Sequence, residues 1–558
     1  MERRWYKVWP EHVPKSFEVQ KPLPEYLREW ATKAPEGIAL SFYGRDITYK
    51  ELDEAIDRFA QGLISLGVKR GDRVALHMQN CPQFMIAFYG ILRAGGVVVA
   101  LNPMFKHLEL EYEINDAQAE TLVGLDYLFP EVEKIRDRVP LKNVILTSLR
   151  DYLPEEPVLP LPQEAEEPKR SFPDTVDFLG LLRDSPSRPL CNVADIKEDL
   201  ALLQYTGGTT GLPKGAMISH YSLVCASLGT VYWFLLSEKD IHMGVTPFFH
   251  ILGMIKAVCA PLISGGRVVI LSRFIPEVVA RAIDHYRCTF WEAATTMFIA
   301  LLGFQGVERY DFSSFRVLFT GGAPISVEIQ KKIKELAPRA AIGEAYGLSE
   351  TLAQGGAITP LNRYKPGFIG IPQLNDIKIV DMEAGERELP PNEQGEIAIK
   401  GPTIMKGYWR RPEETKEVLR DGWFYTGDIG LMDEEGYIKL LGRKKELIKC
   451  SGYSVFPPEV EHILYRHPAV AEVAVIGVPD PYRGESPKAF IVLRPEYKGK
   501  VKEEDILEWC KGNMATYKRP REVEFRDELP KSGAAKILRR VLKEEEERRR
   551  DKLVRTGL

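Results

Sequence analysis

Cysteine is scarce in this chain and follows no disulfide or metal-binding pattern. The seven cysteines are scattered, odd in number, and include no Cys-x-x-Cys pair. Such a set argues against a disulfide framework and a cysteine zinc site, and it predicts reduced thiols in the cytoplasm. Residues 1–7 have no apolar core, so we expect no secretory signal.

The chain also lacks an excess of charge and an uninterrupted apolar span. A net charge of −4 over 558 residues gives no general attraction to nucleic acid or to an anionic membrane. Residues 215–237 contain no Asp, Glu, Lys or Arg and are long enough to cross a bilayer. Because they include His220 and several serines, we interpret them as a buried helix and predict no transmembrane segment. Peripheral contact with a membrane and a homodimer both stay open.

The chain does contain a regular alternation of helix and strand patterns. Its length exceeds what one hydrophobic core supports, so several domains are expected. Helical patterns at residues 24–34, 49–66 and 82–94 alternate with apolar runs at 73–78 and 97–101. This alternation predicts an α/β fold. Residues 151–198 are rich in Pro and Glu and predict a surface excursion. A β-rich pattern begins at residue 395.

The densest cluster of unusual residues is the segment 205–215, with the sequence Tyr-Thr-Gly-Gly-Thr-Thr-Gly-Leu-Pro-Lys-Gly. Glycines let successive N–H groups point into one concavity that binds anions, and Lys214 adds a positive charge. The segment therefore suits a polyphosphate. A Walker A loop needs Gly-Lys-Ser/Thr, whereas here Pro213 precedes the lysine and Gly215 follows it. The alternative is a glycine-rich hairpin with a surface lysine.

Further segments offer groups that suit a nucleotide. Residues 320–324 form a second glycine turn after an apolar strand. In residues 343–351, Tyr346 offers a ring for base stacking and Glu350 a carboxylate for Mg²⁺. His250 and Asp428 each lie at an expected strand end. Taken alone, each has an ordinary alternative, such as a packed core histidine, a helix cap or a solvated turn aspartate.

In this order, the segments resemble the motifs of adenylate-forming enzymes, the superfamily of acyl-CoA synthetases, peptide-synthetase adenylation domains and luciferases. The resemblance extends from about residue 49 to residue 536 and is closest to fatty-acyl-CoA synthetases, through residues 344–347, 517–520 and 528–532. Two positions depart from the family pattern. Ser349 replaces a threonine and keeps the hydroxyl, and Ala535 stands where the family usually has glycine.

The resemblance implies a nucleotide site and a catalytic group. ATP and then AMP would be bound by Thr206, Gly207, Gly208, Thr209, Thr210, Lys214, Gly322, Ala323, Pro324, Glu344, Tyr346, Gly347, Ser349, Asp428 and Arg443. Glu350 would hold Mg²⁺, His250 would lie beside the carboxylate substrate, and Lys536 would be the catalytic lysine of adenylate formation.

The resemblance also implies domains and substrates. A large N-terminal domain, 1–442, would combine layered α/β subdomains with a β-rich subdomain. A hinge at 443–445, centred on Lys445, would lead to a small mobile C-terminal α+β domain, 446–558. Coenzyme A would pass Lys449, Ser451 and Gly452, and the acyl group would contact Trp233, His250, Leu252 and Ala345.

The predicted reaction is ATP-dependent acyl-CoA synthesis through an acyl-adenylate. Because Leu252 carries no polar group for a phenol, we expect medium- or long-chain fatty acids. Two alternatives stay open. One is an aryl- or hydroxyacid–CoA ligase. The other is a catalytically silent adenylate- or acyl-CoA-binding protein, which only the departure at Ala535 favours.

Overall fold

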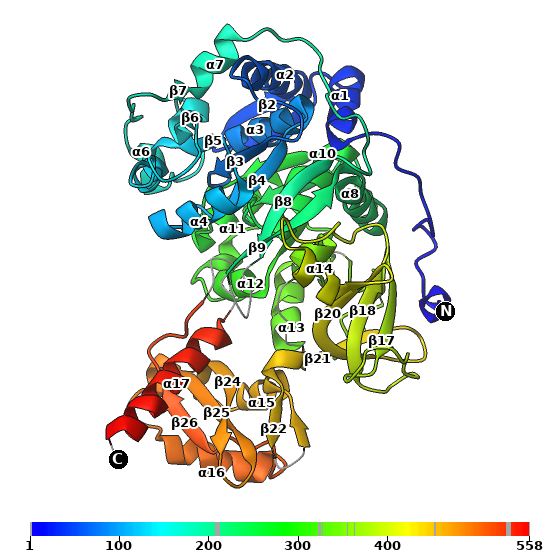
Figure 1. Ribbon diagram of the computed structural model, residues 1–558, viewed down its shortest axis with the longest axis vertical. Helices are drawn as coiled ribbons and strands as arrows, with labels where there is room; N and C mark the ends of the chain where they lie inside the picture. Colours follow the sequence, from blue (N-terminus) through cyan, green and yellow to red (C-terminus); the bar gives the residue numbers. More distant parts are fainter. Residues whose placement is uncertain are drawn as a thin grey trace. The chain divides into compact units, whose positions relative to one another are not determined.

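The computed structural model describes residues 3–206, 212–321, 325, 327–353, 355–361, 363–450, 453–531 and 537–556 (Figure 1). The chain divides into two compact units. The first unit comprises Met1–Ile377, Ile399–Phe424 and Glu435–Tyr437, and the second comprises Lys378–Ala398, Tyr425–Glu434 and Ile438–Leu558. This division into units does not test the hinge expected at 443–445, which stays a prediction.

The first unit confirms the predicted α/β fold. One sheet has the strand order β7-β6-β5-β3-β4-β8-β9, and a second has the order β16-β15-β14-β13-β12-β10-β11-β1-β2. Neighbouring strands are mostly parallel, as in β3–β4 and β12–β13. The strands are β1 Ile38–Phe42, β2 Arg45–Thr48, β3 Arg73–His77, β4 Val97–Leu101, β5 Thr121–Leu125, β6 Asn143–Thr147, β7 Val176–Asp177, β8 Leu200–Thr206, β9 Lys214–Ser219, β10 Ile241–Gly244, β11 Arg267–Ile270, β12 Phe290–Ala294, β13 Val317–Gly321, β14 Ala341–Ala345, β15 Ala357–Ile358 and β16 Ile371–Pro372.

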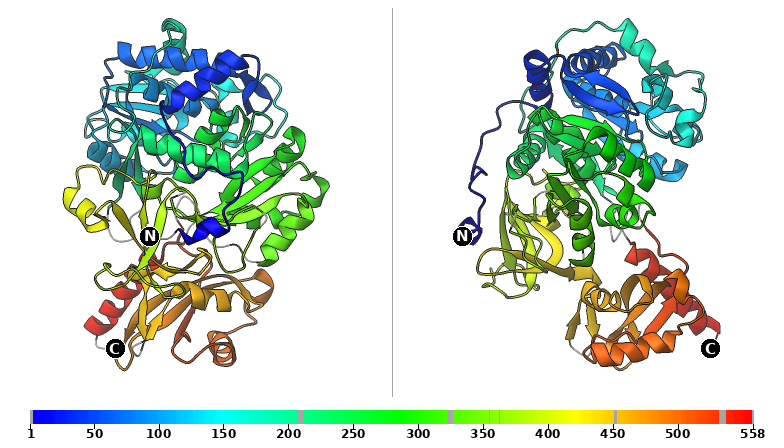
Figure 2. Two further views of the ribbon diagram at one scale, coloured as in Figure 1. Left: turned by 90° about the vertical axis from the view of Figure 1, so that its right-hand side faces the viewer. Right: turned by 180° about the vertical axis from the view of Figure 1, so that it is seen from behind.

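Helices connect these strands and cover the sheets (Figures 1 and 2). They are α1 Leu23–Lys33, α2 Tyr49–Ser65, α3 Pro82–Ala94, α4 His107–Ala117, α5 Phe129–Glu133, α6 Gln163–Glu166, α7 Phe178–Asp184, α8 His220–Phe234, α9 Ile251–Gly253, α10 Ala260–Ser264, α11 Pro276–Tyr286, α12 Thr295–Leu302, α13 Val327–Leu336 and α14 Pro412–Val418. A π-helix, η4, spans Met254–Cys259, and a 3₁₀ turn, η6, spans Ser349–Thr351.

Local sequence signals explain the bounds of α2 and α3. Thr48 caps α2 by accepting from the N–H of Glu51, whose side chain accepts from the Thr48 N–H in return. Helix α3 begins with Pro82 and ends at Gly95, whose φ of 82° suits a residue without a side chain. The two helices pack closely at Gly90, where a Cβ would lie 2.7 Å from the Phe59 ring.

Two expectations for the first unit are wrong in part. Residues 215–237 do not form one helix, because residues up to Ser219 pair with β8 as strand β9 before α8 begins. The segment 151–198 is not only a surface excursion. Strand β7 extends the sheet by pairing with β6, and Phe178 is fully buried against Phe59. Within the described ranges, no helix combines the length and apolar character needed to cross a membrane.

The remaining elements form two smaller sheets. One has the order β17-β18-β20-β19, with β21 also on β20, and the other has the order β23-β22-β25-β24, with β26 on β25. Their strands are β17 Asp376–Val380, β18 Gly395–Lys400, β19 Leu419–Arg420, β20 Trp423–Met432, β21 Ile438–Arg443, β22 Ile448–Cys450, β23 Tyr453–Val455, β24 Val470–Asp480, β25 Gly484–Leu493 and β26 Glu522–Phe525. The helices are α15 Pro457–Leu464, α16 Glu503–Asn513 and α17 Arg539–Thr556.

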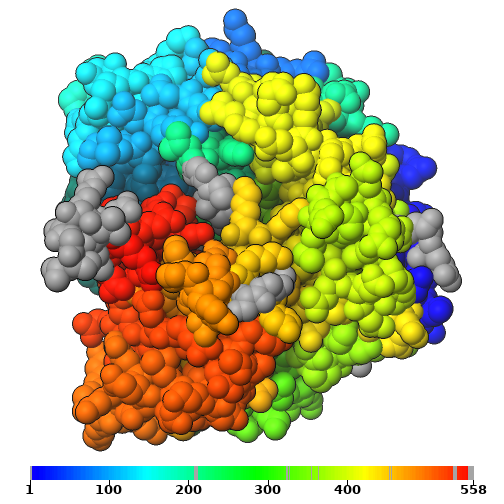
Figure 3. Space-filling model, turned by 60° about the horizontal axis from the view of Figure 1, so that its bottom comes forward, coloured from blue at the N-terminus to red at the C-terminus, as the bar shows by residue number. Residues whose placement is uncertain are grey.

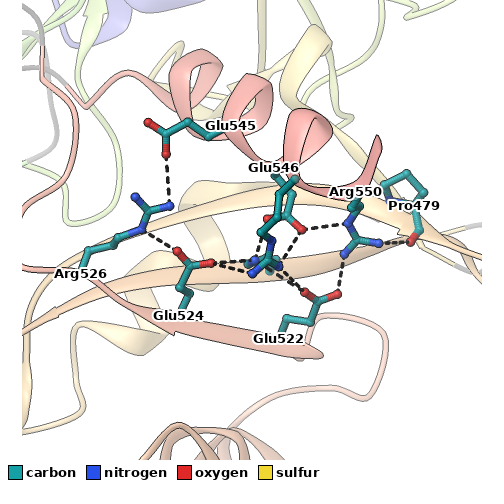
Figure 4. A network of polar contacts seen from close by, with 9 residues as sticks. Pro479, Glu522, Glu524, Arg526, Glu545, Glu546 and Arg550 are labelled. Carbon is teal, nitrogen blue, oxygen red and sulfur yellow. Dashed lines mark hydrogen bonds and ion pairs between the residues drawn. The ribbon is translucent and has the colours of Figure 1, made fainter. Parts of the chain in front are cut away.

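A network of charged side chains holds α17 on its sheet in the second unit (Figure 4). Lys488 of β25 is 2% exposed and lies 2.8 Å from Glu546 of α17 and 2.9 Å from Glu524 of β26. Arg550 of α17 bonds both Glu546 and Glu522. The opposite charges compensate for the burial of Lys488. Part of α17 is visible in red in Figure 3, and its residues 540, 543, 545 and 547–549 are exposed.

Candidate active site

Strands β8 and β9 bring the two ends of the predicted phosphate loop together. Thr206 and Lys214 are cross-strand partners in this antiparallel hairpin. The Lys214 ammonium lies 3.6 Å from the carboxylate of Glu414 and 5.1 Å from the centre of the Tyr408 ring. The predicted loop residues between the strands lie outside the described residues: Gly207, Gly208, Thr209 and Thr210.

Helix α4 fixes this hairpin from one side. The Tyr205 hydroxyl donates to Asp116 (2.8 Å), and the Tyr112 hydroxyl donates to the carbonyl of Pro213 (2.8 Å). Burial, and then the hydrogen bond to Asp116, raise the pKa of Tyr205 well above its usual value. Tyr205 is therefore a neutral donor at any physiological pH, and both ends of the loop start from a fixed backbone.

A short segment, residues 405–409, runs antiparallel beside β9 and forms backbone hydrogen bonds with it. The N–H of Met217 donates to the carbonyl of Gly407 (2.9 Å), and the N–H of Trp409 donates to the carbonyl of Gly215 (2.8 Å). Tyr408 forms an antiparallel bridge with Ala216. This segment therefore lies next to the base of the phosphate loop.

The predicted metal carboxylate, Glu350, lies on the other side of the same segment. Its side chain, on turn η6, is nearly buried, and its Oε1 accepts a hydrogen bond from the Tyr408 hydroxyl (2.8 Å). The N–H of Met405 donates to the Glu350 carbonyl (2.9 Å). The structure thus connects Lys214 and Glu350 through Tyr408. Sequence reasoning missed Tyr408 as a site residue.

The predicted adenine motif lies at the carboxyl ends of parallel strands. Gly321 of β13 pairs with Ala345 of β14 and with Ala294 of β12, so these three strands end side by side. Ser349 begins η6, next to Glu350. The predicted residues that follow β13 lie outside the described residues: Gly322, Ala323 and Pro324.

Close backbone packing fixes the turn that carries Tyr346. The Tyr346 N–H donates to the carbonyl of Ala357 (2.7 Å). A Cβ on Gly347 would lie 2.3 Å from the carbonyl carbon of Ala353, and a Cβ on Gly356 would lie 2.3 Å from the Tyr346 ring. Neither glycine has room for a side chain, so the position of the Tyr346 ring depends on both.

Glu344 is a nearly buried carboxylic acid beside this turn. Burial raises its pKa to about 7, and hydrogen bonds from the Ile325 N–H and the Tyr364 hydroxyl oppose that rise. At neutral pH the side chain can therefore either donate or accept a hydrogen bond. Its backbone N–H is bonded to the Thr359 hydroxyl (3.0 Å).

Two of the predicted acyl residues converge on the end of β13. The Leu252 side chain lies 3.3 Å from the point where a Cβ of Gly321 would be, and Ala345 is the neighbour of Gly321 on the next strand. His250 caps α9, where its Nδ1 accepts from the N–H of Leu252 (3.3 Å).

The fourth acyl candidate, Trp233, is fully buried in α8. Its indole N–H donates to the carbonyl of Thr359 (3.1 Å), and its ring packs edge-on against Trp9 at 5.7 Å. Trp9 belongs to the N-terminal segment that runs in an extended path before α1 (Figure 2). These contacts give Trp233 a packing role, and its contact with an acyl chain stays a prediction.

In the second unit, the two predicted ribose ligands lie side by side. Asp428 of β20 and Arg443 of β21 are cross-strand partners, and the Arg443 Nε lies 2.9 Å from the Asp428 carboxylate. Lys445 lies in a 3₁₀ turn, and Lys449 lies on β22. Three other predicted residues of this unit lie outside the described residues: Ser451, Gly452 and Lys536.

Backbone hydrogen bonds join the residues just before 532–536 to the residues just after them. Lys531 and Ile537 form an antiparallel bridge, and the N–H of Leu538 donates to the carbonyl of Pro530 (2.8 Å). Helix α17 begins directly afterwards, where Arg539 bonds both Glu461 (2.6 Å) and Glu446 (3.0 Å).

Comparison with known families decides the classification. Residues 27–409 match the family model of the AMP-binding enzyme, and residues 459–536 match the model of its C-terminal domain. The chain belongs to the AMP-binding enzyme family. The predicted family membership is therefore confirmed.

Individual relatives of this AMP-binding enzyme are similar over nearly their full length. It is 38% identical to a long-chain-fatty-acid–CoA ligase of Bacillus subtilis (strain 168) and 35% identical to one of Escherichia coli O6:H1, with 98% of each chain covered in both cases. The crystal structure of ATP-bound MatB from Rhodopseudomonas palustris has a TM-score of 0.81 and 29% identity, covering 94% of this chain and 98% of that one.

For a divalent cation, the described part of the AMP-binding enzyme places the nearly buried carboxylate of Glu350 beside Tyr408. Among the described residues, no group of three His, Cys, Asp or Glu side chains is placed to hold a metal ion. Mg²⁺ in nucleotide sites is commonly held by one or two carboxylates together with water and phosphate oxygens. Glu350, close to Lys214 and the base of the phosphate loop, fits that mode of binding.

The AMP-binding enzyme also contains an unexpected buried ion pair near the acyl candidates. The ammonium of Lys256, in η4, lies 3.1 Å from the carboxylate of Glu292 on β12, and these side chains are 2% and 0% exposed. The carboxylate of Glu292 lies 3.8 Å from the point where a Cβ of Gly321 would be. Burial lowers the pKa of Lys256 and raises that of Glu292, and the attraction between the two opposes both shifts.

Proposed function

We propose that this enzyme is an ATP-dependent fatty-acid–CoA ligase. The observation that carries the proposal is full-length similarity to two long-chain-fatty-acid–CoA ligases. The arrangement of Lys214, Tyr408 and Glu350 beside the phosphate-loop hairpin is consistent with it.

In the proposed first step, a carboxylate oxygen of the fatty acid attacks the α-phosphorus of ATP. A C–O–P bond forms, the bond to the β-phosphate oxygen breaks, and pyrophosphate leaves. Lys214 would neutralise phosphate charge, and Lys536 would stabilise charge that grows on the α-phosphate in the transition state. Magnesium bound at Glu350 would supply further positive charge to the phosphates. Tyr346 would stack on adenine, and Asp428 with Arg443 would bind the ribose.

In the proposed second step, the sulfur of coenzyme A attacks the acyl carbonyl carbon, and AMP leaves. We propose that the part of the chain after 443–445, residues 446–558, changes position at Lys445 between the two steps. Lys449, Ser451 and Gly452 would then border the path of the coenzyme A arm. We also propose a cytoplasmic location, because all seven thiols are unpaired.

For the acyl group we propose a medium- or long-chain alkyl pocket bordered by Leu252 and Ala345, with Trp233 and His250 nearby. Each methylene that becomes buried contributes roughly 0.8 kcal/mol, which corresponds to about a fourfold rise in kcat/KM. The rise should stop where the pocket is full.

An AMP-release assay over saturated acids from acetate to stearate, with coumarate included, tests this proposal. We expect kcat/KM to rise with chain length and to exceed the value for coumarate. Ala345→Leu should move the preference towards shorter acids, while Ala341→Leu, at the other end of β14, should not. Preference for coumarate would support an aryl–CoA ligase instead. Absence of pyrophosphate exchange with every acid would support a silent binding protein.

A further inference from the structure

The segment 405–409 contacts both halves of the phosphate and metal site through its backbone. On one side it pairs with β9, where Met217 and Gly215 exchange hydrogen bonds with residues 406, 407 and 409. On the other side the N–H of Met405 donates to the carbonyl of Glu350 (2.9 Å). The segment therefore sets the distance between the base of the phosphate loop and the turn that carries the carboxylate.

Tyr408 adds side-chain contacts to the two charged groups of opposite sign. Its hydroxyl donates to the Oε1 of Glu350 (2.8 Å), and the Lys214 ammonium lies 5.1 Å from the centre of its ring. Tyr408 itself is held, because its N–H donates to the hydroxyl of Thr415 (2.9 Å) and its side chain is nearly buried. A fixed ring between two charged side chains restricts the directions in which both can point.

We propose that Tyr408 is a positioning residue for nucleotide-bound magnesium. Its hydroxyl orients the carboxylate of Glu350, and its ring supports the Lys214 ammonium by a cation–π contact. This inference rests on the proposed function, because it takes Glu350 as the metal carboxylate. Partners that orient a metal ligand are commonly worth 10- to 100-fold in metal affinity.

The Tyr408 hydroxyl also has an opposing effect on metal affinity. Its removal would raise the affinity through the charge of Glu350 and lower it through the orientation of Glu350. A donor withdraws negative charge from the carboxylate, so removing it would strengthen attraction to a cation. The same removal frees the rotation of a side chain whose position the metal needs. Because both side chains are nearly buried and the Thr415 hydroxyl holds the backbone N–H of Tyr408, we expect the loss of orientation to be larger.

Three variants separate the roles. Tyr408→Phe removes only the hydroxyl, Tyr408→Leu removes the ring as well, and Glu350→Gln removes the charge of the carboxylate. Tyr49→Phe is the matched control, because the buried Tyr49 hydroxyl also makes one short hydrogen bond, to the carbonyl of Gly266 (2.7 Å). Melting temperatures identify any variant that fails to fold.

Two kinds of measurement are made on the full-length protein, one of activity and one of binding. The first is the Mg²⁺ concentration that gives half-maximal ATP–pyrophosphate exchange. The second is a binding measurement that needs no turnover, namely calorimetric titration with ATP, with and without metal, and Mn²⁺ binding in the presence of ATP by electron paramagnetic resonance.

We expect Tyr408→Phe to raise the required Mg²⁺ about 10-fold and to weaken Mn²⁺ binding by a similar factor, while metal-free ATP binds as in the wild type. Tyr408→Leu should also weaken metal-free ATP binding, because Lys214 loses its support. Tyr49→Phe should leave all of these quantities unchanged. If Tyr408→Phe does not fold, Thr415→Val, which removes the hydroxyl that holds Tyr408, should raise the Mg²⁺ requirement by a smaller factor.

An unchanged or lower Mg²⁺ requirement in Tyr408→Phe, or in Thr415→Val where that variant is used, would overturn the inference, provided that Glu350→Gln raises it. If Glu350→Gln leaves the Mg²⁺ requirement unchanged, the assignment of Glu350 in the proposed function fails first, and the role of Tyr408 fails with it. Equal losses in Tyr408→Phe and Tyr49→Phe would show that only general stability is affected.

Discussion

The buried pair of Lys256 and Glu292 allows a quantitative test of the structure. Removing one partner of a buried ion pair leaves an uncompensated charge and typically costs 3–5 kcal/mol of unfolding free energy, whereas replacing both with apolar groups is often neutral. With an N–O distance of 3.1 Å and side chains that are 2% and 0% exposed, Lys256 and Glu292 form a fully buried ion pair. We expect Lys256→Met to be strongly destabilised and Lys256→Met/Glu292→Leu to be close to the wild type.

The expected change in melting temperature follows from the size of the first unit. Unfolding entropy is about 2.1 cal/mol/K per residue, and the unit has about 400 residues. A loss of 3–5 kcal/mol should therefore lower its Tm by about 4–6 °C in differential scanning calorimetry. Lys416→Met is the control, because Lys416 and Glu413 form a pair in the same unit with side chains that are 73% and 79% exposed, for which little stability is expected.

Two results would refute this reasoning. If Lys256→Met melts with the wild type, the pair is not a buried and mutually dependent charge pair. If the double variant is as unstable as the single one, the loss comes from packing around η4 and β12, and not from an isolated charge.

Three further predictions concern other parts of the chain. Lys536→Ala should lower adenylate formation by on the order of 10²–10³ and still convert a supplied acyl-adenylate to acyl-CoA, whereas Gly452→Leu should show the reverse; parallel loss of both half-reactions in each folded variant would contradict the two-step model. Burial, and then nearby carboxylates, raise the pKa of Glu113 to about 8. The folded protein therefore keeps this group protonated where the unfolded chain ionises, and stability should fall between pH 4.5 and 8 by on the order of 5 kcal/mol. Glu113→Gln should remove that slope in denaturation measured at pH 5, 7 and 8.5, and an identical slope would exclude this residue as its source. Gly347→Ala would place a Cβ 2.3 Å from a backbone carbon and should weaken ATP binding in calorimetry at least 10-fold, while Gly512→Ala, with nothing within 4 Å of the added carbon, should bind as the wild type does.

Local patterns in the sequence were enough to determine several elements and the family. The helix predicted at 82–94 is α3, because Pro82 and Gly95 act on the backbone within one turn of each end. The order of glycine-rich and charged motifs indicated an adenylate-forming enzyme, and the family models confirm it. These signals are encoded in residues that are close together in the chain, so they do not depend on the rest of the fold.

Tertiary structure decided what depends on distant partners. Residues up to Ser219 form a strand and not a helix because β8 offers hydrogen bonds that local propensity does not count. Tyr408 reaches Glu350 across 58 residues, and Lys256 meets Glu292 only where η4 packs against β12. A buried charge is unfavourable until its partner is in place. The identity of that partner depends on how the strands and helices pack, and no local pattern in the sequence specifies this packing.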